Sequence, residues 1–218
     1  MVTTGTWLEG RTVLISPISL GALNSNERLL EVNLTKRQIE NSPPLNTRQP
    51  VSRQHETAYF DYYGYPYYWT GPYIWGPMVY PSNLPAPSET ETLASMIRAA
   101  KQKEQAEDPH LRSTQAVTGY YIGASDGEIG HVEDFIVDNE SWTIRYMVVD
   151  TRNWWPGKKV LLSPQWIEKV SWADSTVYVD LTRGAIKDAP EYDTSGAVDR
   201  DYEARLHQHY GRQGYWAE

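Results

Sequence analysis

Between residues 120 and 181, apolar and polar residues alternate in short runs, a pattern typical of β-strands with one buried face. The runs Tyr120–Gly123 and Ile129–Asp138 flank the dipeptide Asp126-Gly127, which favours a tight hairpin turn because glycine accepts a positive φ without cost. Further strands are predicted over residues 142–149, 158–162 and 177–181. Several short strands joined by tight turns predict a small antiparallel sheet or barrel.

The strand predicted over residues 142–149 has a clear two-residue period. Ile144, Tyr146 and Val148 fall on one face, and Thr143 and Arg145 fall on the other. We therefore expect the first face to be buried and the second to meet solvent.

Two helices are predicted after the last strand. Thr182 has the hydroxyl of a helix N-cap, and Pro190 lies just beyond the first short helix. The second helix is predicted from Asp199 or Arg200 to His209, ending at Gly211.

A shift of 147 positions lays the first 70 residues over the last 70 without a gap. Residues 6–17 then match residues 153–164, and the later matches include the caps, the last helix and an aromatic pair. These later pairs are Val32 and Val179, Leu34 and Leu181, Thr35 and Thr182, Val51 and Val198, Arg53 and Arg200, Glu56 and Glu203, Tyr63-Gly64 and Tyr210-Gly211, and Tyr68-Trp69 and Tyr215-Trp216. The pattern predicts a tandem duplication of one small module.

The first copy is expected to be incomplete at its N-terminal side. The second copy starts near His110, whereas Met1 matches Val148 in the middle of a predicted strand, so about 35 to 40 opening residues have no counterpart. Met1 is then not the original start of the module, or the missing strands are replaced by the second copy, by a second chain or by the aromatic segment of residues 59–80. We expect Val13 and Ile15 to be left uncovered, with an open strand edge.

The chain is predicted to have three parts: residues 1–64 form the truncated first module with its helical tail, residues 65–107 form a linker, and residues 108–218 form the complete second module. The linker begins with an aromatic segment rich in Tyr, Trp, Pro and Gly, in which repeated prolines exclude a regular helix or central strand. It is either a connection folded over one barrel face or an exposed surface for a partner, with Tyr73, Trp75 and Tyr80 as contact residues. Residues 88–107 are polar and compatible with a helix.

Composition narrows the function. A net charge of −8 argues against non-specific nucleic-acid binding, and no apolar run is long enough for a membrane span. No signal peptide is recognisable, and the absence of cysteine excludes disulfides and thiolate chemistry. We expect a soluble, cytoplasmic protein, while peripheral association with a membrane stays open.

Candidate catalytic and metal-binding groups do not form a recognisable set. His207 and His209 are two residues apart on a helix, where zinc ligands are usually four apart, so a solvated pair is expected. The acidic residues of the hairpin at 128–138 are interpreted as an outer strand face, rather than as an acid/base pair or calcium ligands. We predict no catalytic residues, no metal and no cofactor. Trp154 and Trp155 are candidate contact residues in a loop, or else they cap the open end of a barrel.

Three segments resemble the PRC-barrel domain family. They are Gly119-Tyr120 with residues 126–135, the strand Trp142–Asp150, and the segment Trp154–Pro164. The family is named after the cytoplasmic domain of the photosynthetic reaction-centre H subunit, and a related barrel forms the C-terminal half of a ribosome-maturation factor. The resemblance covers nearly all of residues 108–181, but only the back half of the module in residues 1–34.

The resemblance implies two small, antiparallel PRC-type β-barrel modules with short helices, in a tandem bacterial protein. It implies a docking or assembly module that binds a protein partner or itself, and no enzyme activity. The alternatives are a barrel that binds a small molecule or pigment, and an accessory factor of a photosynthetic complex or of ribosome maturation. The transmembrane helix of the reaction-centre subunit and the N-terminal domain of the ribosome factor have no counterpart in residues 1–218.

Overall fold

The structure is a computed structural model that describes residues 2–4, 12–24, 26–43, 45, 51–73, 75, 76, 78, 80, 81, 109–151 and 157–217. They fall into two compact units: Met1–Arg112 with Glu140–Trp142, and Ser113–Asn139 with Thr143–Glu218. Strands outweigh short helices, so the prediction of a mainly β chain with short helices is confirmed. Within the described ranges, no helix has the length and apolar character needed to cross a membrane.

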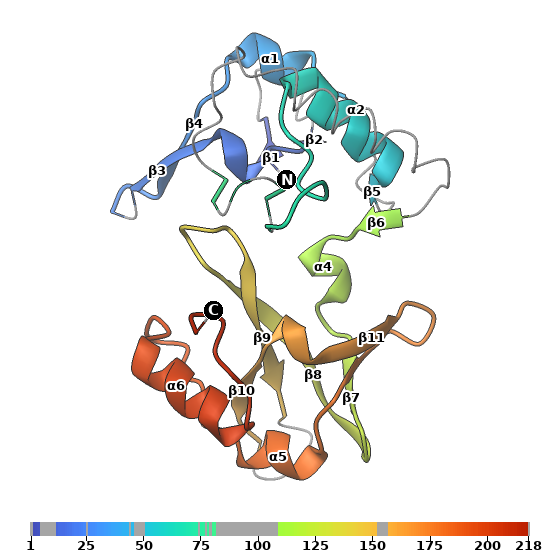
Figure 1. Cartoon of the computed structure of the whole chain (residues 1–218), viewed down its shortest axis with the longest axis vertical. Coiled ribbons are helices and arrows are strands. Elements are labelled where there is room, and N and C mark those ends of the chain that lie inside the picture. The colour runs from blue at the N-terminus through green and yellow to red at the C-terminus, as the bar shows by residue number, and fades with distance from the viewer. Residues whose placement is uncertain are drawn as a thin grey trace. The chain divides into compact units, whose positions relative to one another are not determined.

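The second unit is built on a six-stranded sheet with the order β10-β9-β8-β7-β12-β11 (Figure 1). Its strands are β7 (Tyr121–Ala124), β8 (Gly127–Val137), β9 (Ile144–Asp150), β10 (Lys159–Leu162), β11 (Ile167–Ser171) and β12 (Thr176–Val179). Four of the five pairs of neighbouring strands are antiparallel, but β12 runs parallel to β7, with Val177 opposite Ile122. The sheet is therefore mixed, which local alternation could not indicate because parallel pairing joins strands far apart in the sequence.

Short helical segments complete the second unit. They are α4 (Thr114–Val117), the 3-10 helix η4 (Pro164–Trp166), α5 (Arg183–Asp188) and α6 (Arg200–His209). Thr182 accepts a hydrogen bond from the backbone N–H of Ala185, and Asp199 accepts one from Tyr202, so both helices begin where the sequence predicts.

The predicted burial of β9 is wrong in part. Tyr146 and Val148 are buried as expected, but Ile144 is exposed, and Met147 and Val149 on the opposite face are also buried. The reason is position: β9 lies between β8 and β10, and Tyr146 bonds to residues of α6. A strand covered on both faces loses the simple alternation of buried and exposed residues.

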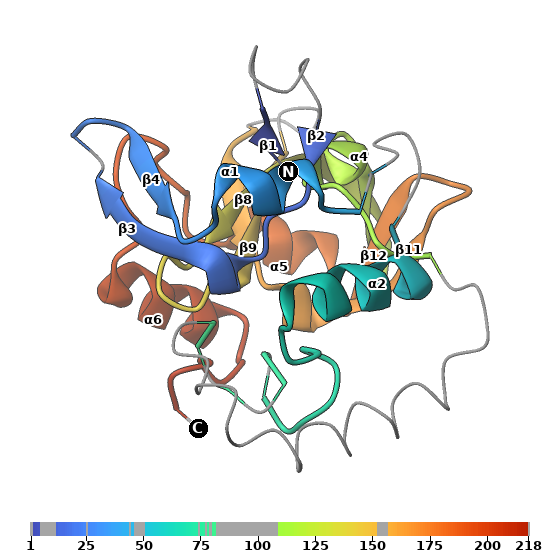
Figure 2. The same ribbon diagram turned by 90° about the horizontal axis from the view of Figure 1, so that it is seen from above.

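The described part of the first unit holds three two-stranded pairings, two α-helices and one 3-10 helix. Its strands are β1 (Val2–Thr3), β2 (Thr12–Val13), β3 (Leu20–Asn24), β4 (Leu29–Val32), β5 (Val51–Ser52) and β6 (Pro109–Leu111). Its helices are η2 (Pro17–Ser19), α1 (Lys36–Glu40) and α2 (Arg53–Tyr63). β1 pairs with β2, β3 with β4 and β5 with β6, and β3–β4 forms a ribbon that projects from the rest of the unit (Figure 2).

Elements of the first unit recur in the second with the same spacing of 147 residues. Ser16 caps η2 as Ser163 caps η4, and Thr35 caps α1 as Thr182 caps α5. Val2 pairs with Val13 in the first unit, and Val149 pairs with Val160 in the second. The sequence predicts the last helix of the first unit from Val51 to Tyr63, but this helix begins at Arg53, because Ser52 takes the N-cap position and β5 precedes it.

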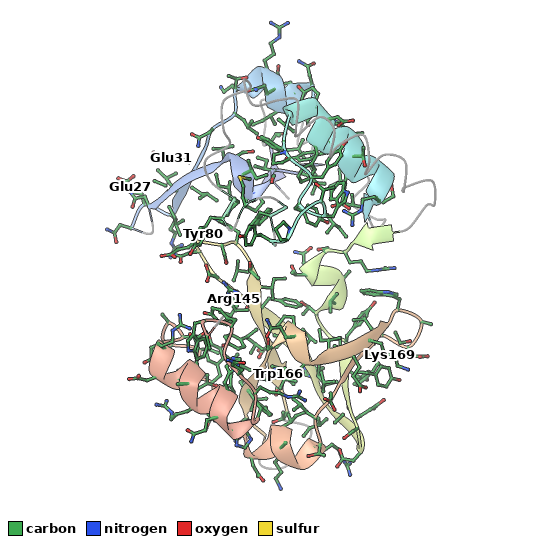
Figure 3. All side chains as sticks on the ribbon, viewed as in Figure 1. Glu27, Glu31, Tyr80, Arg145, Trp166 and Lys169 are labelled. Carbon is green, nitrogen blue, oxygen red and sulfur yellow. The ribbon has the colours of Figure 1, made fainter. Side chains whose placement is uncertain are left out.

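The cores of the two units differ. The second has an extended aliphatic core around the sheet, which includes the buried Trp166 (Figure 3). The first has a small aromatic cluster of Tyr59, Phe60, Tyr65 and Tyr67, against which Leu14 and other side chains pack. Val13 is fully buried, so the expectation that it is uncovered is wrong. Tyr65 and Tyr67, which follow α2, belong to the aromatic cluster of this unit.

Candidate functional site

The segment from Tyr73 to Tyr80 carries three of the predicted contact residues. The backbone groups of Tyr73 and Gly76 bond to each other in both directions, at 3.0 Å each, and form a tight turn. Gly76 has a φ of 72°, and a Cβ there would lie 2.4 Å from the carbonyl oxygen of Tyr67, so the turn packs closely on the preceding chain. Tyr73 and Tyr80 remain 51% and 49% exposed, as a contact surface requires.

Trp75 is placed differently. Its ring is half-buried, its Nε1 donates a 2.6 Å hydrogen bond to the carbonyl oxygen of Ser141, and it meets Tyr68 edge to face. Both polar and apolar parts of the indole therefore hold the first unit together. The structure brings Tyr73 and Tyr80 to the surface and uses Trp75 internally. The remaining candidates, Trp154 and Trp155, lie outside the described residues.

A cluster of Arg, Glu, Tyr and Trp recurs in both units; we call it the tail clamp. In the first unit it consists of Arg53, Glu56, Tyr68 and Trp69. Glu56 is 2% exposed, accepts a 2.7 Å hydrogen bond from the Tyr68 hydroxyl and lies 3.2 Å from the Arg53 guanidinium. That guanidinium stacks 3.9 Å from the Trp69 ring centre. The clamp thus fastens the chain after α2 onto the start of that helix.

The second unit repeats the tail clamp with Arg200, Glu203, Tyr215 and Trp216. Glu203 is 6% exposed, accepts a 3.0 Å bond from the Tyr215 hydroxyl and lies 3.0 Å from Arg200. The Arg200 guanidinium lies 4.3 Å from the Trp216 ring centre. Sequence alignment found all eight residues as matching positions, but it gave no indication that they contact one another.

The second clamp has an additional polar layer. The Tyr146 hydroxyl donates to Glu203 at 2.9 Å and lies 3.1 Å from Nε2 of His207, whose Nδ1 lies 3.0 Å from the carbonyl oxygen of Gln213. His207 is only 3% exposed, so the predicted solvated pair of histidines is wrong. Nothing in the local sequence could show this, because Tyr146 lies 61 residues from His207.

Burial controls ionisation in this layer. Desolvation lowers the pKa of His207 below its ordinary value, although Glu203 opposes the shift. Burial, and next the charge of Glu203, raise the pKa of Tyr146, which stays a neutral donor. With its oxygens engaged by two phenols and a guanidinium, Glu203 serves as a fixed acceptor. These contacts hold Tyr146, Glu203 and His207 in fixed positions within the second unit.

Two acidic residues of the β8–β9 hairpin form ion pairs. Glu133 pairs with Lys159 at 2.8 Å, and Asp138 pairs with Arg145 at 3.2 Å. Across the part of the chain that the structure describes, no three His, Asp or Glu side chains converge as metal ligands. The pairs are consistent with the outer strand face expected from the sequence.

A hollow of about 410 Å³ lies on the β3–β4 ribbon of the first unit, a place the sequence did not indicate. Its lining mixes apolar and polar side chains: Ala22, Leu23, Asn24, Asn26, Glu27, Leu29 and Glu31. Leu23 and Leu29 are 52% and 56% exposed, so the hollow is an open surface feature. Exposed leucines beside carboxylates are better suited to a polypeptide than to an enclosed small molecule.

Comparison with known proteins gives one informative match. No family model matches the chain. An uncharacterized protein of Deinococcus radiodurans is 35% identical over 106 residues, which make up 46% of this chain and 37% of that protein. The chain therefore matches well under half of its relative's length.

Proposed function

We propose that the chain is a tandem pair of PRC-barrel-type modules, the first lacking its opening strands, and that it serves as a non-enzymatic docking module for a protein partner. The observation that carries the proposal is the recurrence, 147 residues apart, of caps, strand pairs and the tail clamp. A repeated module whose buried carboxylates, Glu56 and Glu203, are bound by side chains of their own unit is suited to binding rather than to chemistry.

The docking surface of this proposal contains Tyr73 and Tyr80. Both are half exposed and lie in a segment anchored internally by Trp75. Large aromatic side chains presented by a fixed backbone contribute much binding energy at little entropic cost.

A photo-cross-linking amino acid placed at position 80 tests this function. We expect a discrete adduct with one host protein, and a matched probe at Tyr62, which is 40% exposed on α2, should give none. The purified partner should bind with fixed stoichiometry, and replacing both Tyr73 and Tyr80 by Ala should weaken binding at least about tenfold. Equal labelling from both positions, or binding unaffected by the double substitution, would refute the proposed surface.

A further inference from the structure

Both tail clamps hold the same pair of aromatic residues in tails that otherwise differ. Residues 64–69 of the first tail align with residues 211–216 of the second, and they share only the first glycine and the final Tyr-Trp pair. In each clamp the tyrosine hydroxyl donates to the glutamate, and the arginine lies against the tryptophan ring. The arginine and the glutamate therefore recognise the Tyr-Trp pair itself and tolerate unlike neighbours.

The two tails are anchored to different depths. In the first tail, Tyr65 and Tyr67 are 8% and 0% exposed and belong to the aromatic cluster. The matching residues of the second tail are Arg212, which is exposed, and Gly214, which is half-buried. Every residue from 211 to 217 is exposed or half-buried, and Trp216 is 38% exposed. The second tail thus has no counterpart of the buried tyrosines that hold the first.

The further contacts of the second tail are polar or lie near its surface. The carbonyl oxygen of Gln213 lies 3.0 Å from Nδ1 of His207, and the His207 ring meets Trp216 edge to face. Arg212 pairs with Asp180 at 2.7 Å, but these side chains are 39% and 63% exposed, so solvent screens the pair. Segments with few buried apolar contacts open locally at a small free-energy cost. The second tail is therefore expected to leave its clamp more readily than the first.

The groups that hold the second tail come from the helix and the sheet. Arg200 and Glu203 lie on α6, and Arg145 lies on β9 (Figure 3), with its guanidinium 3.9 Å from the Tyr215 ring centre. Glu203 also accepts a 2.9 Å hydrogen bond from Tyr146, which keeps the carboxylate oriented. Two guanidinium groups and a fixed carboxylate suit a pair of aromatic rings, one of which carries a hydroxyl.

We propose that this site binds a Gly-Tyr-Trp segment of a partner protein in place of the chain's own tail, an inference that rests on the proposed docking function. The tyrosine of the segment donates to Glu203 and its tryptophan lies on Arg200, as Tyr215 and Trp216 do. Glycine precedes the pair because a Cβ at Gly214 would lie 2.4 Å from the Trp216 ring. The chain's own tail is then an internal competitor at high local concentration, which a partner with additional contacts displaces.

A second copy of this chain is a less favourable source of the segment. Its tail would make the same contacts in the clamp of another chain that it makes in its own. Exchange between copies therefore gains no contact, and it gives up the high effective concentration of a tail attached to its own clamp. A segment of another protein can add contacts beyond the Gly-Tyr-Trp sequence, so it is the favoured occupant.

A labelled peptide with the sequence of residues 211–218 tests the site on the whole chain. Replacing both Tyr215 and Trp216 by Ala empties the clamp, and this variant should bind the peptide saturably and one to one by fluorescence anisotropy. The unsubstituted chain should bind it at least about tenfold more weakly, because its own tail competes. Trp216→Ala alone removes one partly exposed ring and perturbs the fold least; it should bind the peptide with intermediate affinity.

Further substitutions test which groups recognise the peptide. In the emptied clamp, Arg200→Ala should weaken binding at least about fivefold, because it removes the cation that stacks on tryptophan and pairs with Glu203. Arg205→Ala is the matched control, since Arg205 is an exposed arginine of the same helix, and should change binding less than about twofold. A peptide with Phe in place of Tyr215 should bind about tenfold more weakly, because it cannot donate to Glu203.

Absence of saturable binding to both tail variants would overturn the proposal. Equal affinity of the unsubstituted chain and the emptied clamp would do so too, as would equal effects of Arg200→Ala and Arg205→Ala. Dimers of the chain that Arg200→Ala dissociates would show that tails are exchanged between copies, and the proposed partner segment would fail. Each of these results leaves the cross-link at position 80 as an independent test, so the clamp site can fail while the docking function stands.

Discussion

The two units share a run of local elements spaced 147 residues apart, but they bury matching strands to very different extents. Val177 and Val179 on β12 are each 1% exposed, whereas Leu30 on β4 is 39% exposed and Val32 is half-buried. The caps, the 3-10 turns and the tail clamps are nevertheless alike in both units. The shared local structure therefore follows short-range sequence, whereas the greater burial of β12 accompanies its pairing with β7 in the second unit.

The first unit has its buried cluster around α2 rather than around the β3–β4 ribbon. Where the second unit buries His207 beneath Tyr146, the first has Phe60 in the matching position, within the cluster of Tyr59, Tyr65 and Tyr67. Tyr59 also accepts a hydrogen bond from the backbone N–H of Ser16 at 2.8 Å. Aromatic residues of α2 and the chain after it form the buried cluster of the first unit, while the leucines of its β3–β4 ribbon remain exposed.

A charge placed at matching positions of β12 and β4 should give the largest difference in stability loss between the two units. Val177→Asp should destabilise the second unit by about 4 kcal/mol or more, because it buries an unpaired carboxylate in the sheet. Leu30→Asp should change the stability of the first unit by less than about 0.5 kcal/mol, because that side chain already meets solvent. Urea unfolding followed by hydrogen exchange of each unit measures both values.

Comparable losses in the two variants would contradict the difference in burial. They would mean that the β3–β4 ribbon is covered as fully as β11–β12. The surface variant Leu111→Asp controls for the general effect of an added negative charge on an acidic chain.

The sequence predicted most local features because they depend on neighbouring residues. Thr35 and Thr182 cap helices, and α6 ends at His209, as turn and cap chemistry indicated. The parallel pairing of β12 with β7 was beyond such reasoning, because it joins residues over 50 positions apart. The burial of Val13 was missed for the same reason, since it depends on distant packing.

The candidate site was less predictable than the fold. Aromatic composition identified Tyr73, Trp75 and Tyr80 as candidate contact residues but left their exposure open. It could not show that Tyr73 and Tyr80 are exposed or that Trp75 donates a hydrogen bond to a carbonyl oxygen 66 residues away. The sequence showed the residues of the tail clamp only as identical residue types at matching positions of the two copies. In each clamp the arginine and the glutamate lie at the start of a helix, and the tyrosine and the tryptophan lie in the chain that follows it. They meet because the chain folds back along the helix.

The next largest loss of stability is expected from the polar layer of the second clamp, which is formed by Tyr146, Glu203 and His207. Tyr146→Phe removes the hydroxyl that bonds to Glu203 and His207, and should cost the second unit about 1 to 2 kcal/mol. Tyr121→Phe removes a hydroxyl from a ring that is 51% exposed and should have no measurable effect. Chemical denaturation of both variants tests the layer; equal stability would show that the buried hydroxyl contributes nothing.

The pH dependence of the second unit should follow from His207. Its folded pKa lies below the ordinary 6.5, so the unfolded state binds more protons and stability falls as the pH drops below about 6.5. Replacing His207 by Phe, the residue at the matching position of the first unit, should flatten this dependence even if it lowers overall stability. Melting curves between pH 7.5 and pH 5 measure the slope, and an unchanged slope in His207→Phe would assign the titration elsewhere.

The two clamp arginines should differ slightly but measurably. The Arg53 side chain is 11% exposed and the Arg200 side chain is 55% exposed, although both pair with a buried glutamate and stack on a tryptophan. Lysine retains the charge but loses the planar stacking, so Arg53→Lys should cost about 1 kcal/mol. Arg200→Lys should cost less than about 0.5 kcal/mol, because solvent screens an exposed pair. Fluorescence of Trp69 and Trp216 during denaturation reports each clamp; a larger loss in Arg200→Lys would reverse the order expected from burial, and the second clamp would then depend on its guanidinium more than its exposure suggests.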